Sequence, residues 1–114
     1  MPTAKRVGWL DVREHLLDTF GGDEEAVRLD VEEGISTCWQ INNIYMITRR
    51  EGKTLIIVCI GGEGMREVAQ MIIEAAKKSG CTDIRYHTAR KGMGRILEKF
   101  GAELEECIYR IKLT

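Results

Sequence analysis

The middle of the chain contains a glycine-rich turn between an apolar run and a helical pattern. The run at residues 55–60 is followed by Gly61, Gly62, Gly64, Met65 and Arg66. Glycines at such a turn let the backbone approach a phosphate closely, and the unpaired N–H groups that begin a helix attract anions. These residues therefore predict an anion-binding corner. The alternative that so short a motif leaves open is a tight strand-to-helix turn without a ligand.

A second group of residues suited to an anion is basic. Arg90, Lys91 and Arg95 follow His87 in a segment expected to join a strand to a helix. Residues 49–100 carry 11 basic and 6 acidic side chains, whereas residues 1–48 carry 4 and 9, so an anionic partner is expected in the middle of the chain. Solvated helix faces also explain these charges. Tyr86 is the aromatic residue near the group, and nucleic-acid binding by stacking is not expected.

Acid–base and metal chemistry have few candidate residues. Glu63 and His87 are the side chains placed to exchange a proton near the two groups above, and they are the candidate catalytic residues. Cys59 is expected to be a buried thiol because no basic residue lies near it in the sequence. The 4 cysteines and 2 histidines lack the close pairs of a zinc site, so no metal is predicted.

Length and composition predict a single domain over residues 1–114. Hydrophobic residues make up 44% of the chain and charged residues 31%, which is typical of a protein that folds around one modest core. The longest apolar run, at residues 55–60, is far shorter than the ~20 residues that cross a bilayer, and the first residues lack the apolar core of a signal peptide. We therefore expect a cytoplasmic protein with no membrane partner.

Hydrophobic periodicity predicts alternating blocks of helix and strand. Helices are expected at residues 8–20, 24–33, 65–79 and 93–100, and strands at residues 36–41, 44–50, 53–60, 83–88 and 106–113. The first three strands are joined by short turns and should form an antiparallel meander. The strand–helix–strand unit from residue 54 to 88 should place two strands parallel. The expected fold is α/β, or α+β, with a mixed, mostly antiparallel sheet of about six strands and helices on both faces.

This order of elements resembles the GNAT superfamily of N-acetyltransferases over nearly the whole chain. The resemblance implies that acyl-CoA, such as acetyl-CoA, places its pyrophosphate at the corner formed by Gly61, Gly62, Gly64, Met65 and Arg66. It also implies that Trp39 and Tyr45 lie where family members shape the acceptor side of the cleft. The chain departs from the family pattern at two places: apolar residues precede the glycines, and Leu97 occupies the position of the usual catalytic tyrosine.

Several segments resemble small phage-encoded GNAT-like proteins. These segments read CWQI, GGEGMRE, AAKKSGCTDIRYHTARKGMGRILEKFGA and YRIKL. The resemblance implies a phage or prophage protein in the cytoplasm of its bacterial host, with weak or no acyl-CoA-dependent N-acyltransferase activity. The alternative is a non-catalytic virion or host-interaction component on the same fold, whose partner would be a protein. An exposed edge strand would also allow a homodimer.

Overall fold

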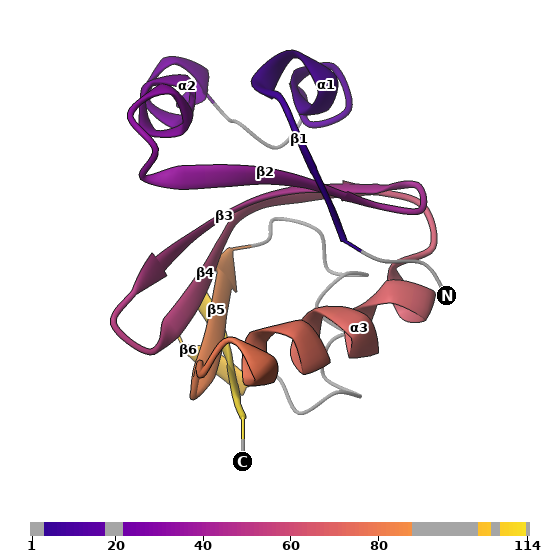
Figure 1. Ribbon diagram of the computed structural model, residues 1–114, viewed down its shortest axis with the longest axis vertical. Coiled ribbons are helices and arrows are strands. Elements are labelled where there is room, and N and C mark those ends of the chain that lie inside the picture. Colours follow the sequence, from indigo (N-terminus) through magenta and orange to yellow (C-terminus); the bar gives the residue numbers. More distant parts are fainter. Residues whose placement is uncertain (1–3, 18–21, 88–102, 106–107, 114) are drawn as a thin grey trace.

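The computed structural model describes residues 4–17, 22–87, 103–105 and 108–113. In chain order the elements are β1 (Lys5–Val7), α1 (Trp9–Arg13), α2 (Glu24–Glu32), β2 (Ser36–Ile41), β3 (Ile44–Glu51), β4 (Thr54–Gly62), α3 (Met65–Lys78), β5 (Asp83–His87), β6 (Glu103–Glu105) and β7 (Ile108–Lys112). Within these residues seven strands form one sheet in the order β1-β2-β3-β4-β5-β7-β6. Helices α1 and α2 lie on one side of the sheet and α3 on the other (Figure 1). The expected mixed sheet with helices on both faces is confirmed.

The antiparallel meander forms as the sequence predicts. Asn42 and Asn43 join β2 to β3 in a two-residue turn, and Asn42 takes a left-handed backbone conformation with φ of 54°. Along the β3–β4 ladder, Ile47 is opposite Cys59 and Thr48 is opposite Ile57. Val58, which lies between Ile57 and Cys59 in β4, is therefore the extra residue of a β-bulge.

Strands β4 and β5 are parallel, as the strand–helix–strand pattern predicts. Their ladder runs from Thr54 opposite Asp83 to Ile57 opposite Tyr86. The Thr54 hydroxyl donates a hydrogen bond of 2.6 Å to Asp83 Oδ1, which ties the beginnings of the two strands together. Because β4 continues to Gly62, the two strands are paired only along the first part of β4.

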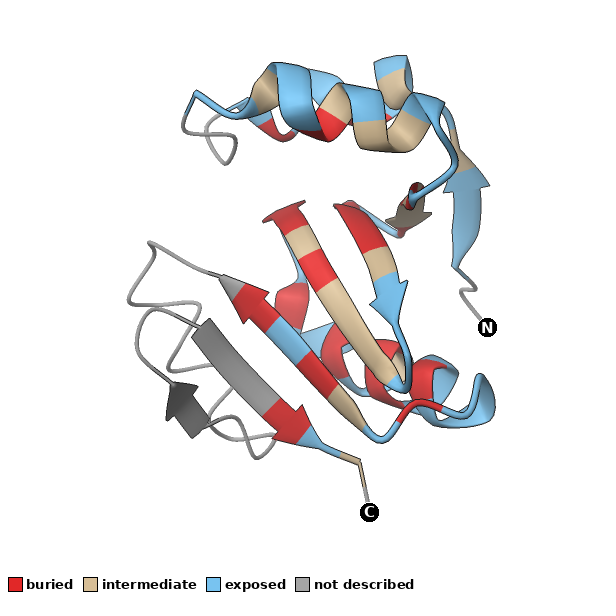
Figure 2. Ribbon diagram, turned by 90° about the vertical axis from the view of Figure 1, so that its left-hand side faces the viewer, coloured by how far each residue is buried: buried red, intermediate tan, exposed pale blue. Residues whose placement is uncertain are grey.

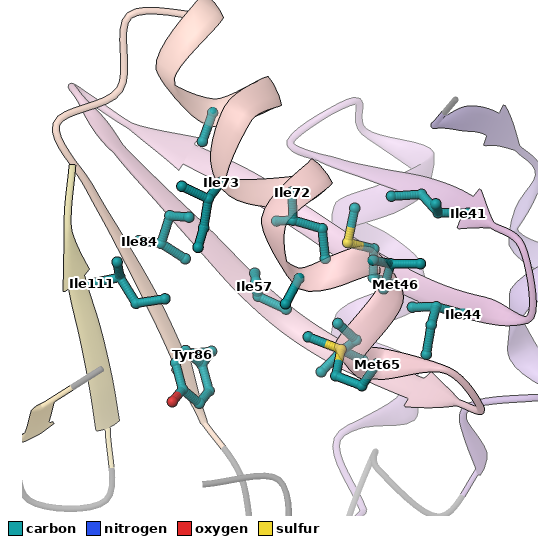
Figure 3. Packing of buried hydrophobic residues seen from close by; sticks show 14 of the residues in the cluster. Ile41, Ile44, Met46, Ile57, Met65, Ile72, Ile73, Ile84, Tyr86 and Ile111 are labelled. Atoms are coloured by element: carbon teal, nitrogen blue, oxygen red, sulfur yellow. The ribbon is translucent and has the colours of Figure 1, made fainter. Parts of the chain in front are cut away.

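Each face of the sheet carries its own apolar cluster, and buried residues lie along β2, β3, β4 and β5 (Figure 2). The cluster on the α3 face is the larger of the two. To it the helix contributes the predicted stripe of Met65, Val68, Ala69, Ile72, Ile73 and Ala76. Figure 3 shows Ile72 and Ile73 directed toward the strand residues Ile57 and Ile84. The opposite cluster joins Val12, Leu16 and Val27 to Cys38, Ile47 and Cys59.

The N-terminal segment differs from the sequence-based expectation. The helix expected at residues 8–20 begins at Trp9 and ends at Arg13, and the side chains of Leu10 and Leu17 are 80% and 47% exposed. The edge strand β1 was not predicted, since three residues of which two are charged show no strand periodicity. The helix expected at residues 93–100 lies outside the described residues. None of the described helices has the length and apolar character needed to cross a bilayer.

Candidate functional site

The corner between β4 and α3 is built by two glycines in left-handed conformations. Gly62 has φ of 119° and Gly64, which caps the N-terminus of α3, has φ of 91°. A β-carbon on Gly62 would lie 2.0 Å from the backbone oxygen of Asn43. The same oxygen accepts a hydrogen bond of 3.2 Å from the Glu63 N–H. The corner therefore packs directly against the β2–β3 turn, which by itself explains a glycine at position 62.

The beginning of α3 offers backbone donors to a ligand. Gly64 has no side chain to cap the helix, and the N–H groups of Met65 and Arg66 have no carbonyl one turn earlier within the helix. The Met65 side chain is buried in the core, so this residue can serve a ligand only through its backbone. Arg66 is exposed and adds a positive charge in the first turn. Gly61 is buried at the end of β4.

Two carboxylates stand beside these donors. Glu63 and Glu67 line a shallow hollow of about 640 Å³ together with Asn42, Asn43 and Gly64. Glu67 Oε2 lies only 3.3 Å from the position of a β-carbon on Gly64, so the carboxylate reaches back over the helix start. A carboxylate at a helix N-terminus is attracted to the same dipole that would attract a phosphate. The protein's own anions therefore compete with a ligand at this corner.

The candidate catalytic residues are not brought together. His87 follows Tyr86 at the end of β5 and so lies level with Val58 in the neighbouring strand, because Tyr86 is opposite Ile57. Glu63 is five residues beyond Val58, a backbone separation of roughly 16 Å along a strand. The side chain of Glu63 is exposed. The backbone positions of the two candidate residues are therefore well separated along the sheet.

The thiols of the described cysteines are buried, as expected. Burial, with the nearby Asp11 carboxylate, raises the pKa of Cys38 to about 11, so that thiol is protonated near neutral pH. Cys59 packs in the same cluster as Cys38. Among the described residues, no three His, Cys, Asp or Glu side chains come together in a way that would hold a metal ion.

Trp39 and Tyr45 do not line a common cleft, because they lie on opposite faces of the sheet. Trp39 packs against the α3 cluster, whereas Tyr45 packs against the cluster beneath α1 and α2. The Tyr45 ring stacks on His15 with ring centroids 3.8 Å apart and planes 2° from parallel. Both rings line a polar hollow of about 490 Å³ beside β1. This contact could not be predicted from local patterns, because it joins the segment after α1 to a distant strand.

The basic residues Arg90, Lys91 and Arg95 lie outside the described residues, as does Leu97. The carboxylate of Glu67 is the feature of the corner that sequence reasoning missed. Its signal is the spacing Gly-x-x-Glu at the start of a helix, in which the third helical residue can reach back toward the N-cap.

No protein-family model matches the sequence, and no curated protein is significantly similar to it. Solved structures are similar in fold. A Bacillus subtilis acetyltransferase in complex with CoA superposes with a TM-score of 0.74 at 14% identity over 100% of both chains.

Two further acetyltransferase structures are similar in fold to this chain. The Escherichia coli ribosomal-protein-S18-alanine N-acetyltransferase gives a TM-score of 0.74 at 11% identity, covering 100% of this chain and 95% of the enzyme. A Staphylococcus aureus Mu50 acetyltransferase of the GNAT family gives 0.70 at 11% identity over 100% of both chains. The chain therefore has the fold of the GNAT acetyltransferases.

Proposed function

We propose that this chain binds acyl-CoA at the β4–α3 corner and that its N-acetyltransferase activity is weak or absent. The observation that carries the binding proposal is the start of α3, where uncapped N–H groups and Arg66 follow Gly62 and Gly64. Such a helix start binds the phosphates of a ligand. The similarity in fold to an acetyltransferase in complex with CoA supports the same location.

The point at which the β4–β5 pairing ends supports a binding place for the part of acyl-CoA that lies beyond its phosphates. Pairing stops at Ile57 and Tyr86, although β4 continues to Gly62. Within the described residues no strand pairs with this side of β4 beyond Ile57, so the later part of β4 offers an edge along which an extended amide-containing chain can lie. The pantetheine portion of acyl-CoA is a chain of this kind. Its phosphates would then reach the corner.

Two features support weak activity. Glu63 and Glu67 place negative charge beside the helix start, which disfavours a polyanionic ligand there. Residues 55–60 of β4 are apolar, so the central strand supplies no carboxylate to take a proton from an attacking amine. Both features lower the expected rate of acyl transfer without removing the binding surface.

Thermal unfolding with and without acetyl-CoA tests the binding proposal. A ligand at 100 times its dissociation constant adds ~2.7 kcal/mol to the free energy of unfolding, which raises the melting temperature measurably. We expect a rise with acetyl-CoA in the wild type and a smaller rise in Arg66→Gln. An unchanged melting temperature at millimolar acetyl-CoA would rule the proposal out.

Release of free CoA in the presence of peptide and polyamine acceptors tests the activity. We expect turnover far below the 1–10³ s⁻¹ that is typical of enzymes, or none above the acceptor-free control. Turnover within the typical range would contradict the proposal of weak activity while leaving the binding site intact.

We extend the proposal to a phage or prophage origin and to the cytoplasm of a bacterial host. This extension rests on the sequence segments that resemble small phage-encoded GNAT-like proteins. Sequencing the genes on either side tests it, since phage structural or replication genes should flank the coding region. Flanking genes of ordinary host metabolism would contradict it.

A further inference from the structure

A pocket on the α3 face lies away from the β4–α3 corner. It has a volume of about 470 Å³ and is lined mainly by β2, β3, the beginning of β4 and the C-terminal half of α3. This volume is within the range of small-molecule sites, roughly 300–1,000 Å³. Ala75 in its wall is ten residues beyond Met65, which places it about 15 Å along the helix from the corner. The pocket is therefore separate from the proposed acyl-CoA site.

The alternation of side chains along the strands fixes which of them face the pocket. In β2, Trp39 packs against the α3 cluster, and Thr37, two positions earlier, points to the same side. In β3 that side carries Met46 and Thr48, which is opposite Thr37 in the ladder. Arg49 follows Thr48 and therefore faces α1 and α2, so its charge does not enter the pocket. The rest of the lining is largely apolar and includes Ile35, Ile41, Leu55, Ile72 and Ala76.

Most hydrogen-bonding side chains of the wall are already bonded within the protein. The Trp39 indole Nε1 donates a hydrogen bond of 2.9 Å to the Thr48 hydroxyl, so the ring offers apolar surface to an occupant. The Ser79 hydroxyl donates to the Ala75 carbonyl oxygen at 3.0 Å. Thr37 differs, because it is half-buried and its hydroxyl has no hydrogen-bond partner among the described residues. One hydroxyl is therefore available to a ligand.

The charge that faces this side of the sheet is that of Arg50, which is opposite Leu55 in the ladder. Its Nε donates to the Gly52 oxygen at 2.8 Å and its Nη1 to the Ser79 oxygen at 2.7 Å. Its Nη2 lies beside Gly80, outside the lining. A carboxylate in the pocket would have to compete with these backbone oxygens, and an ammonium would find no acidic residue in the described wall. Because burying a charge without a partner is costly, the wall favours an uncharged occupant.

We propose that this pocket binds an uncharged, mainly hydrocarbon molecule with a single hydroxyl or carbonyl group, the class to which medium-chain alcohols belong. The hydrocarbon part lies against Trp39, Met46 and Ile72, and the oxygen bonds the Thr37 hydroxyl. Burial of the hydrocarbon supplies most of the affinity, and the hydrogen bond orients the ligand. This inference does not depend on acyl-CoA binding at the corner.

Titration of the ¹⁵N-labelled chain with 1-octanol tests the proposal. We expect saturable shifts of the Trp39 indole and of the amides around Thr37 and Ala75. Octanoate has a chain of the same length but carries a charge, and it should bind at least about tenfold more weakly. Octanoate binding as tight as that of octanol, shifts confined to Gly61–Arg66, or no saturable shift would each overturn the proposal.

Two variants, each with a matched control, locate the ligand. Thr37→Val is nearly isosteric and should weaken octanol binding about fivefold, whereas Thr82→Val, at an exposed threonine outside the lining, should not change it. Ala75 is exposed on the helix, so Ala75→Leu should fold normally, fill the pocket and abolish octanol binding. Lys77→Leu adds a leucine to the same helix outside the lining and should leave binding intact. Equal octanol affinity in the wild type, Thr37→Val and Ala75→Leu would place the ligand elsewhere and overturn the proposal.

Discussion

The backbone oxygen of Asn43 lies 2.0 Å from the position that a β-carbon on Gly62 would occupy. This relationship joins the β2–β3 turn to the end of β4, and the Glu63 N–H donates to the same oxygen. The glycine is therefore required by packing, whether or not a ligand binds. Gly64 differs, because the nearest atom to its added β-carbon is the flexible Glu67 carboxylate at 3.3 Å. Of the two glycines, Gly64 is the one whose absent side chain leaves the helix start open to a ligand.

Replacing Gly62 by alanine should destabilise the protein strongly. The substitution combines a backbone conformation unfavourable to alanine with a backbone clash, so we expect a loss of at least about 3 kcal/mol in the free energy of unfolding measured with urea. Gly52→Ala is the matched control, since Gly52 also has positive φ but nothing within 4 Å of an added β-carbon. It should cost only about 1 kcal/mol. Equal losses in the two variants would contradict the close contact with Asn43.

Replacing Glu67 by glutamine should strengthen acetyl-CoA binding. Removing a negative charge from the first turn of α3 frees the helix dipole for the ligand, an effect of about 0.3–1 kcal/mol or roughly two- to fivefold in affinity. Glu74→Gln removes the same charge from an exposed position later in the helix and should leave the affinity nearly unchanged. Calorimetric titration measures both. A weaker affinity in Glu67→Gln would show that the carboxylate assists the ligand and does not compete with it.

The buried Cys38 thiol should make stability depend on pH in the alkaline range. Its pKa is about 11 in the folded chain, against an ordinary value of 9.0 that applies when the chain is unfolded. Between these values the folded form keeps a proton that the unfolded form loses. The free energy of unfolding should therefore fall as pH rises from 9 to 11, by at most about 2.7 kcal/mol from this group.

Cys38→Ala provides the comparison, because other groups titrate in the same range in both proteins. Subtracting the two pH profiles isolates the thiol, and the difference should be flat below pH 9 and fall above it. A flat difference up to pH 11 would mean that the thiol ionises as easily in the folded chain as in the unfolded one.

Arg50 should stabilise the end of α3. Its guanidinium donates to the Ser79 oxygen at the helix C-terminus and to the Gly52 oxygen in the β3–β4 turn. Arg50→Met keeps the aliphatic part but leaves both oxygens without this donor, and we expect a loss of about 1–3 kcal/mol in urea unfolding. Lys77→Met, at an exposed position of the same helix end, should change stability by less than about 0.5 kcal/mol.

Strong periodicity made much of the fold predictable. The buried stripe of α3 from Met65 to Ala76 and the meander with its Asn42–Asn43 turn follow local rules, and the parallel pairing of β4 with β5 follows from the intervening helix. β1 and the early end of α1 were not predictable, because short elements are fixed by neighbours distant in the sequence.

The candidate site was predictable only in part. The glycine spacing identified the corner, since left-handed backbone positions favour glycine. The contact of Gly62 with Asn43 and the stacking of His15 on Tyr45 depend on which distant segments meet in space. The hydrophobic periodicity of one segment does not predict contacts with a distant segment.

Amide chemical shifts during an acetyl-CoA titration test the central proposal most directly. Binding at the β4–α3 corner predicts saturable shifts at Gly61, Gly62, Gly64 and Arg66, with little change at Trp39 or Ala75. Shifts that are absent at millimolar acetyl-CoA, or that gather away from the start of α3, would contradict it.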